Sequence, residues 1–457
     1  MRLPNPSEGL ANTLYQRRQK LAQLVDFPVL LWSGGVRSRN FPANIYPFRA
    51  SSHFLYFAGL SLVDTVIHLE GGKLTLFMDD PDPGSALWHG DKSPHAIASL
   101  KLSVPTPHFP KSELTLKTQN AATVRVQDLA TIGEMERILK RPVIAPVAAT
   151  GQDLALIKAI INLRLCHDPA ALSELKKAAA VTVKAHQAGI LATPTASQES
   201  DIRAAMEAVI IAHNMTCSYN SIVTTEGQVL HNELYHNPLK SGDLLLADVG
   251  AETPGGWAGD VTRTWPVSGT FSPTQADIYD VVLAAHDACI EQVKPGVEYR
   301  DIHLLATAVI TEGLVDLGIL RGQVTELVEK DAHALFFPHG IGHLLGLDVH
   351  DMEDLGDLAG YAPGRKRSDR FGLGFLRLNR PLAPGMLVTI EPGFYQVPAI
   401  LNNPKNRQTY RDIVNWEQLE KFADVRGIRI EDDVLVTDSG WEVLTAALPS
   451  QRHQITK

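Results

Sequence analysis

The sequence predicts an α/β (α+β) protein of two domains, and three observations lead to this prediction. The chain has 457 residues, of which 44% are hydrophobic and 20% charged, as in globular proteins large enough for more than one core. Its first third alternates strand-like runs with Pro- and Gly-rich turns, whereas the rest alternates helical and strand-like patterns. A helix start, Asp168 followed by Pro169, separates the two parts. We therefore expect an N-terminal domain over residues 1–165 and a C-terminal domain over residues 166–457.

The N-terminal part contains the segments of a small α/β domain. Its strand-like runs are FPVLLWSGG, FLYFAGLSLVDTVIHLEGGKLTLFMDDPDPG and KRPVIAPVA. The aromatic residues Tyr46, Phe48, Phe54, Tyr56 and Phe57 form a strand-like stretch, where aromatic side chains usually pack in the core. We expect core packing from this stretch, not a ligand surface.

The C-terminal part combines helices with strands that carry acids. Helical patterns cover about 199–213, 273–293, 299–317 and 323–335. The strand-like runs between and after them are DLLLADVGAE, DVTRTWPVSG, MLVTIEPGFY and GIRIEDDVLVTDSG. Because burying a carboxylate without a partner costs several kcal/mol, acids inside several apolar strands indicate a shared cation.

Charge and composition exclude several classes of function. The chain carries 42 basic and 51 acidic residues, a net charge of −9, and lacks the long basic run that a nucleic-acid surface needs. The densest basic cluster, Arg365, Lys366, Arg367 and Arg370, is predicted to be a solvated loop without a function. Three scattered cysteines predict neither a disulfide framework nor a thiolate zinc site.

Location is predicted from what the sequence lacks. The N-terminal residues show no apolar leader segment, and no stretch reaches the 18 or so apolar residues that span a bilayer. We expect a cytoplasmic protein without membrane or nucleic-acid partners.

Five residues within the acid-bearing segments form a candidate metal set. Each has a common alternative, since an Asp near a Gly is often a turn residue and a strand Glu is often exposed. Together, four carboxylates and one imidazole carry a charge of −4, which balances two divalent cations. Oxygen ligands with one nitrogen suit manganese, cobalt or zinc, and two such ions about 3.5 to 4 Å apart can share a bridging hydroxide. The five are Asp248, Asp260, His343, Glu391 and Glu431.

These segments resemble the pita-bread metallopeptidases, the family of prolidase, aminopeptidase P and methionine aminopeptidase. The resemblance extends from Asp168 to about Pro449 and rests on motifs in the family's order. They are LLLADVGAE, GDVTRTWPVSG, PHGIGHLLGLDVHD, PLAPGMLVTIEPGFY and GIRIEDDVLVTDSG. It implies a pita-bread catalytic domain behind an aminopeptidase P-like N-terminal domain, and two divalent metal ions per subunit, with manganese first and cobalt or zinc as alternatives.

The resemblance assigns a role to each of the five. Asp248 is expected to bind one metal, Asp260 and Glu431 to bridge both, and His343 and Glu391 to bind the other. Glu391 is also expected to move a proton from the attacking water.

Four further residues follow from the same resemblance. His339 and His350 are expected to stabilise charge on the substrate carbonyl, and His231 to position the substrate. His236 lies close to His231 and is the alternative for that role. Arg429, two residues before Glu431 on an alternating strand, is expected to support the site.

The sequence favours two branches of the family, prolidase and aminopeptidase P. The insert GFLRLNRPLAPGM and the long run between Glu391 and Glu431 look like prolidases, which cleave Xaa-Pro dipeptides. There, Arg377 would grip the free carboxylate of the dipeptide; the alternative is a solvated loop arginine. The N-terminal segments QRRQKL and YPFRASSHFLYFAGL are equally similar to aminopeptidase P, which acts on longer Xaa-Pro peptides. We interpret the chain as a prolidase, with aminopeptidase P as the alternative.

Other members of the fold remain as remote alternatives. A methionine aminopeptidase does not fit the long N-terminal domain, and a metal-free binding protein or creatinase-like enzyme would not need all five ligand residues. The resemblance also implies a homo-oligomer, either a dimer or a dimer of dimers, that acts on Xaa-Pro dipeptides or short peptides.

Overall fold

The computed structural model describes residues 8–82, 84–90, 108–117 and 120–455. The chain separates into two compact units, and the predicted two-domain α/β organisation is confirmed. The first unit comprises Met1–Leu165 with Asp354–Ala359, and the second comprises Cys166–Glu353 with Gly360–Lys457. Residues 1–7, which were inspected for a leader, lie outside the described residues. Among the helices that the structure describes, none combines the length and apolarity needed to cross a bilayer.

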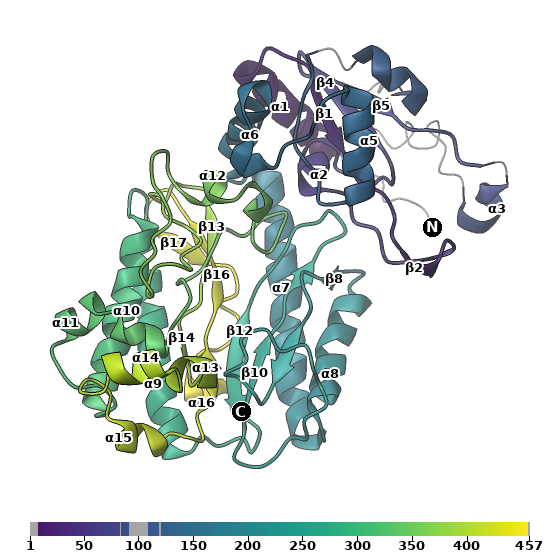
Figure 1. The fold of residues 1–457 in the computed structure, drawn as a ribbon. Helices are drawn as coiled ribbons and strands as arrows, with labels where there is room; N and C mark the ends of the chain where they lie inside the picture. The colour runs from purple at the N-terminus through teal and green to yellow at the C-terminus, as the bar shows by residue number, and fades with distance from the viewer. Residues whose placement is uncertain (1–7, 83, 91–107, 118–119, 456–457) are drawn as a thin grey trace. The chain divides into compact units, whose positions relative to one another are not determined.

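A mixed five-stranded sheet forms the centre of the first unit, in the order β6-β5-β4-β1-β7 (Figure 1). The neighbours β1, β4 and β5 are antiparallel, whereas β7 and β6 join the two edges in parallel. A separate hairpin pairs β2 with β3. The strands of this unit are β1 Val29–Trp32, β2 Ser38–Phe41, β3 Asn44–Ile45, β4 Val66–Glu70, β5 Lys73–Phe77, β6 His108–Phe109 and β7 Ala122–Thr123.

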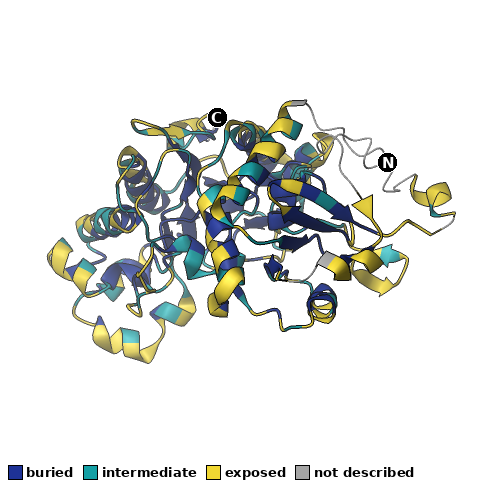
Figure 2. Cartoon of the chain, turned by 90° about the horizontal axis from the view of Figure 1, so that it is seen from above, coloured by how far each residue is buried: buried dark blue, intermediate teal, exposed yellow. Residues whose placement is uncertain are grey.

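Helices pack on this sheet and complete the first core. Trp32 and Phe77 from the sheet pack with Met135 of α5 in one buried cluster. Phe54 and Phe57 are also fully buried, as predicted, whereas Tyr46 is 52% exposed, so the prediction of core packing is wrong for that residue. Figure 2 shows the dark-blue strands beside helices with exposed outer faces. The helices are α1 Glu8–Leu24, α2 Ser52–Ala58, α3 Ser85–His89, α5 Leu129–Leu139 and α6 Gly151–Arg164.

Long helices of the second unit begin at the caps that the sequence contains. The carboxylate of Asp168, the residue before Pro169, accepts a hydrogen bond from the backbone N–H of Ala171. Ser272 caps α9 in the same way, through the N–H of Gln275. The helices are α7 Pro169–Ala192, α8 Glu199–Ala212, α9 Pro273–Glu291, α10 Tyr299–Asp316, α11 Val324–Glu329, α13 Pro398–Leu401, α14 Pro404–Thr409, α15 Trp416–Glu420 and α16 Arg452–Ile455; α12, Asp357–Gly360, lies at the unit boundary.

The second unit is built on short antiparallel strands. One sheet has the order β12-β10-β9 and another β13-β16-β17, while β14 pairs with β15 and β11 with β8. The strands are β8 Thr216–Cys217, β9 Ile222–Thr224, β10 Leu244–Asp248, β11 Ala251–Glu252, β12 Thr262–Pro266, β13 Leu387–Ile390, β14 Gly393–Tyr395, β15 Gly427–Arg429, β16 Asp432–Val436 and β17 Trp441–Val443.

One predicted helix is divided. The pattern over 323–335 predicts a single helix, but α11 ends at Glu329 and a 3₁₀ turn covers Ala332–Leu335. Asp331, between them, has φ +56°, which interrupts the helical hydrogen bonds.

Candidate active site

The alternation of β10 directs Asp248 into the site. Leu245 and Ala247 pack in the apolar cluster of the second unit, whereas Leu246 packs with Tyr395 on the opposite face. Because side chains alternate along a strand, Asp248 shares the face of Leu246. The register pairs Asp248 with Thr262 of β12, whose preceding loop carries Asp260.

The two glutamates come from neighbouring strands of a second ladder. Leu387–Ile390 pairs with Asp432–Leu435 in antiparallel register, and Ile390 lies opposite Asp432. Glu391 follows that pair on one strand and Glu431 precedes it on the other. Continuing the register by one residue therefore sets the two carboxylates across from each other.

Backbone pairing with β13 holds His343 beside these acids. The Thr389 N–H donates to the carbonyl of His343 at 3.0 Å, and the Glu391 N–H donates to the carbonyl of Ile341 at 2.8 Å. Gly342 makes this approach possible, because a Cβ there would lie 2.2 Å from the Thr389 carbonyl oxygen, and its φ is +154°. The HGIGH segment is therefore an extended loop, as its glycines predict.

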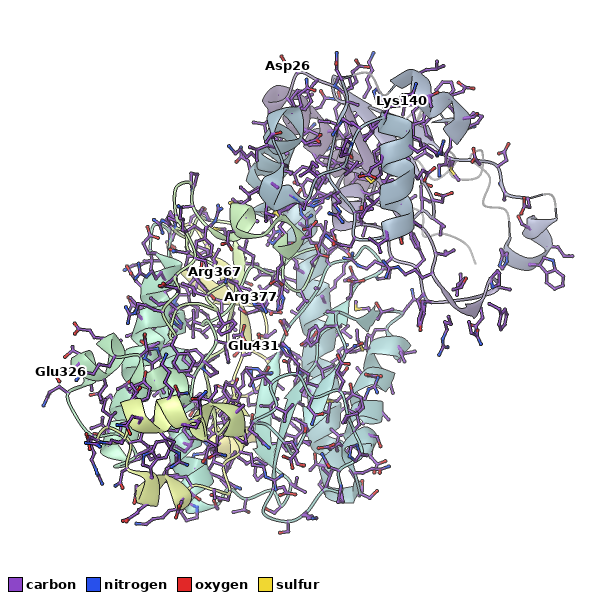
Figure 3. All side chains as sticks on the ribbon, viewed as in Figure 1. Asp26, Lys140, Glu326, Arg367, Arg377 and Glu431 are labelled. Carbon is purple, nitrogen blue, oxygen red and sulfur yellow. The ribbon has the colours of Figure 1, made fainter. Side chains whose placement is uncertain are left out.

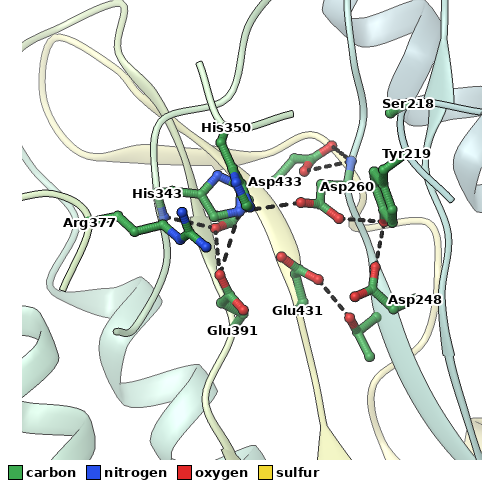
Figure 4. A network of polar contacts seen from close by, with 12 residues as sticks. Ser218, Tyr219, Asp248, Asp260, His343, His350, Arg377, Glu391, Glu431 and Asp433 are labelled. Carbon is green, nitrogen blue, oxygen red and sulfur yellow. Dashed lines mark hydrogen bonds and ion pairs between the residues drawn. The ribbon is translucent and has the colours of Figure 1, made fainter. Parts of the chain in front are cut away.

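These residues converge on one space. His343 Nε2 lies 3.3 Å from Asp260 Oδ2 and 3.5 Å from Glu391 Oε1. One ligand atom each from Asp260, His343 and Glu431 lies within 4.8 Å of the others. Figure 4 shows the carboxylates of Asp248, Asp260, Glu391 and Glu431 directed toward that common space from different segments of the chain.

Electrostatics within this cluster favour a bound cation. Burial and repulsion from Asp248 raise the pKa of Asp260 to about 7. Burial also raises the pKa of Glu391 to about 7, although His343 opposes the rise. For Glu431, burial and the nearby acids Asp260 and Glu391 raise the pKa well above its usual range. Clustered buried carboxylates that resist ionisation, beside an imidazole, fit a site for divalent metal ions.

Burial also keeps the imidazole of His343 ready to bind a metal. Desolvation lowers the pKa of His343, so the ring is neutral near pH 7. Its Nδ1 lies 3.0 Å from the carbonyl oxygen of Leu344, which fixes the ring with Nε2 facing the acids.

Arg429 forms hydrogen bonds that hold two of these acids in place. Its Nη2 donates to Asp248 Oδ2 at 2.6 Å, and its Nε donates to Thr262 Oγ1 at 2.9 Å. Thr262 Oγ1 in turn donates to Glu431 Oε2 at 2.7 Å. The expected supporting arginine thus contacts one candidate ligand directly and a second through a threonine.

Three further predicted residues line the same cavity. The cavity has a volume of about 900 Å³ and includes His231, His339 and His350 in its walls. His339 Nδ1 lies 3.9 Å from Glu391 Oε2, and the His350 ring lies 4.3 Å from that of His343. His231 and its alternative, His236, are both exposed, but of the two only His231 is in the cavity wall.

Arg377 also lines the cavity, so it is not a freely solvated loop residue. Its guanidinium forms an ion pair with Glu353. Arg367 lines the cavity as well and donates to the carbonyl oxygen of Leu376 at 3.0 Å. The four basic residues of the predicted solvated loop, Arg365, Lys366, Arg367 and Arg370, are all exposed, and of them Arg367 is at the edge of this cavity. Figure 3 labels Arg367 and Arg377 with Glu431 in this unit.

Three residues of the site carry no clear signal in the sequence. The hydroxyl of Tyr219 lies 2.5 Å from both Asp248 Oδ1 and Asp260 Oδ1. The hydroxyl of Tyr395 lies 2.9 Å from His339 Nε2. Glu353 contacts Arg377 and His350. Acids are so common in loops that this one cannot be told from a surface residue in a single sequence.

The fold and this acid-rich centre are those of a two-domain metallopeptidase. The model of metallopeptidase family M24 matches residues 173–438, and that of the aminopeptidase P N-terminal domain matches residues 14–116. The chain belongs to metallopeptidase family M24.

The similarity to known proteins covers nearly the whole chain. A probable Xaa-Pro aminopeptidase of Fusarium vanettenii is 32% identical over 416 residues, covering 88% of this chain and 85% of that protein. The structure of Escherichia coli aminopeptidase P with the inhibitor Pro-Leu is 26% identical, with a TM-score of 0.78 over 99% of this chain and 98% of that one. Pseudomonas aeruginosa aminopeptidase PepP is 27% identical, with a TM-score of 0.78 over 98% and 97%.

Proposed function

We propose that this chain is a metal-dependent Xaa-Pro peptidase with the specificity of an aminopeptidase P. The observation that carries this proposal is similarity across both domains. The Fusarium vanettenii relative and the bacterial structures bear aminopeptidase names, and their likeness includes the N-terminal domain. The prolidase interpretation from the sequence is supported less well, because it rests on inserts in the catalytic domain alone.

Five residues would hold the metal ions in the proposed enzyme: Asp248, Asp260, His343, Glu391 and Glu431. Two divalent cations there would supply Lewis-acid polarisation of the scissile carbonyl and make the attacking water more acidic. Manganese is our first choice, with cobalt or zinc as alternatives, because the donors are mostly oxygen.

The protein's own groups would manage the proton and the developing charge. Glu391 is the proposed proton carrier: its carboxylate would accept a proton from the attacking water and return it to the proline nitrogen. His339 and His350 would stabilise charge on the carbonyl oxygen. Tyr395, hydrogen-bonded to His339 and to Arg429, would hold His339 in place.

The chemistry of the Xaa-Pro bond accounts for a dedicated enzyme. Proline has no N–H and a fixed φ, so enzymes that bind substrates as a β-strand lose a hydrogen bond at this residue. In the proposed site the reacting bond is held by the acid-rich centre and by side chains such as His231, none of which requires that N–H.

A prolidase remains the second candidate, and one observation favours it. Arg377 lines the cavity, and a guanidinium is well suited to grip the carboxylate of a dipeptide. We test the choice with Mn²⁺-loaded protein on Ala-Pro and on Ala-Pro-Ala. Faster turnover of Ala-Pro-Ala supports aminopeptidase P, and cleavage confined to Ala-Pro overturns it in favour of prolidase. If neither peptide is cleaved, the proposed function is wrong.

Two further expectations, one from the resemblance and one from the composition, stay proposals. We propose a homo-oligomer, a dimer or a dimer of dimers, which sedimentation equilibrium of the full chain tests. The expected cytoplasmic location stays a prediction that cell fractionation would check.

A further inference from the structure

The cavity contains a carboxylate to which the proposed chemistry assigns no part. Glu353 forms an ion pair with Arg377, and its Oε2 lies 2.5 Å from His350 Nδ1. Both partners line the cavity, as Glu353 itself does. One acid thus engages the guanidinium that would grip a substrate carboxylate and the imidazole beside it.

Local structure holds Glu353 in this position. Its N–H donates to the carbonyl of His350 at 3.2 Å, at the start of a 3₁₀ turn over Glu353–Leu355. This turn holds the backbone of Glu353 close to His350.

Glu353 remains charged in this setting. The hydrogen bond from His350, reinforced by the charge of Arg377, lowers the pKa of Glu353 to about 2 against the opposing effect of burial. The pair of Glu353 and Arg377 is therefore neutral overall at pH 7. A carboxylate that arrives at Arg377 must displace a bound anion or share the guanidinium with it, and like charges at one site repel.

We propose, on the basis of the function proposed above, that Glu353 is a specificity-determining residue that disfavours substrates with a free carboxylate directly after proline. A dipeptide places its carboxylate next to the proline ring, where Glu353 already neutralises Arg377. A longer peptide places a neutral amide there, and a carbonyl oxygen accepts a hydrogen bond from the remaining guanidinium donors without a second negative charge. The enzyme thus favours peptides that continue beyond proline.

The sharpest test compares Ala-Pro with Ala-Pro-NH₂, which differ in the carboxylate alone. With Mn²⁺-loaded wild-type protein we expect kcat/KM to be at least about tenfold higher for the amide, because the carboxylate meets an occupied guanidinium. A wild-type enzyme that prefers Ala-Pro overturns the proposal, and this measurement requires no variant to fold.

Two variants then assign the preference to its residues. Glu353→Gln keeps the shape of the side chain but removes its charge, so we expect the preference for the amide to fall at least about fivefold through a lower KM for Ala-Pro. The double variant Glu353→Gln with Arg377→Ala should lose this gain, because the freed guanidinium is absent. The matched control is Glu298→Gln, which breaks an exposed pair with Arg365 outside this cavity and should leave the ratio unchanged.

The possible failures are distinguishable. An unchanged ratio in Glu353→Gln, or a gain that survives in the double variant, overturns the role of Glu353 while the peptidase proposal stands. No turnover of either substrate by the wild-type protein overturns the proposed function and this inference together.

Discussion

Arg429 donates a hydrogen bond to Asp248 Oδ2 at 2.6 Å, and this pair joins the end of β15 to the end of β10. Both side chains are buried, at 5% and 13% exposure. Despite burial, Tyr395 and the nearby acids raise the pKa of Arg429 well above its usual range, so the guanidinium stays charged. It provides one positive charge beside four candidate ligand carboxylates, and the remaining negative charge calls for protons or metal ions.

Replacing Arg429 should therefore destabilise the metal-free chain. We expect Arg429→Ala to lower the free energy of unfolding by about 3 to 5 kcal/mol, because it leaves Asp248 buried without its partner. Urea unfolding of metal-free protein measures the change. The control is Arg452→Ala, whose exposed pair with Asp280 should contribute about 1 kcal/mol or less. Equal losses in the two variants would contradict the importance of burial.

Metal affinity should rise with pH. Asp260 and Glu391 have pKa values of about 7, so below that pH they release protons when a cation binds. We expect the apparent Mn²⁺ affinity to fall by at least about tenfold as pH decreases from 7 to 6. Titration calorimetry in buffers of different ionisation enthalpy measures both the affinity and the protons released. A constant affinity without proton release would contradict the raised pKa values.

Much of the fold could be predicted because its signals are local. The cap at Asp168 and Pro169 marks the start of α7, and the helical periods of α8, α9 and α10 are long enough to be distinct. The division at Asp331 was missed because its positive φ depends on the surrounding chain. Asp354–Ala359 groups with the first unit although it lies within the second unit's sequence, and such long-range packing has no local pattern.

The candidate site was predictable to the extent that buried acids are unusual. Asp248 and Glu431 stand out in the sequence because apolar strands rarely contain carboxylates. By contrast, Tyr219 lies in a polar segment without periodicity, and its contacts with Asp248 and Asp260 arise from tertiary packing. Glu353 was missed for a similar reason, since its partner Arg377 is 24 residues away in a loop.

The hydroxyl of Tyr219 should support metal binding. It lies 2.5 Å from one oxygen of each of Asp248 and Asp260, and its single proton can be donated to one of them at a time. These two contacts restrain the orientation of both carboxylates. We expect Tyr219→Phe to weaken Mn²⁺ binding by about 10- to 100-fold with little change in fold, as is typical when groups that orient metal ligands are removed. Equilibrium dialysis gives the affinity and circular dichroism checks the fold. Tyr235→Phe, which loses a hydrogen bond to the Ser221 carbonyl, is the control. Similar affinities in wild type and Tyr219→Phe would contradict this role.

Glu391 should be required for turnover beyond its part in holding metal. The side chain is 17% exposed and lines the cavity, so its carboxylate can reach a water molecule there. We expect Glu391→Gln to lower kcat on Ala-Pro-Ala by about 100- to 10,000-fold, since the amide cannot accept the proton from water. Metal content is measured on the same samples at saturating Mn²⁺, so that loss of chemistry is separated from loss of metal.

The matched control for that variant is Glu442→Gln, which breaks an exposed pair with Lys176 and should keep wild-type kcat. A pH profile adds an independent check. If Glu391 is the base, kcat/KM of the Mn²⁺-loaded wild type falls at acidic pH, because protonated Glu391 cannot accept a proton. Near wild-type turnover by Glu391→Gln with both metals bound would show that another group carries the proton. His339 would be a weak substitute base, because burial lowers its pKa to about 3. A His339→Ala variant that keeps the same pH profile would exclude it.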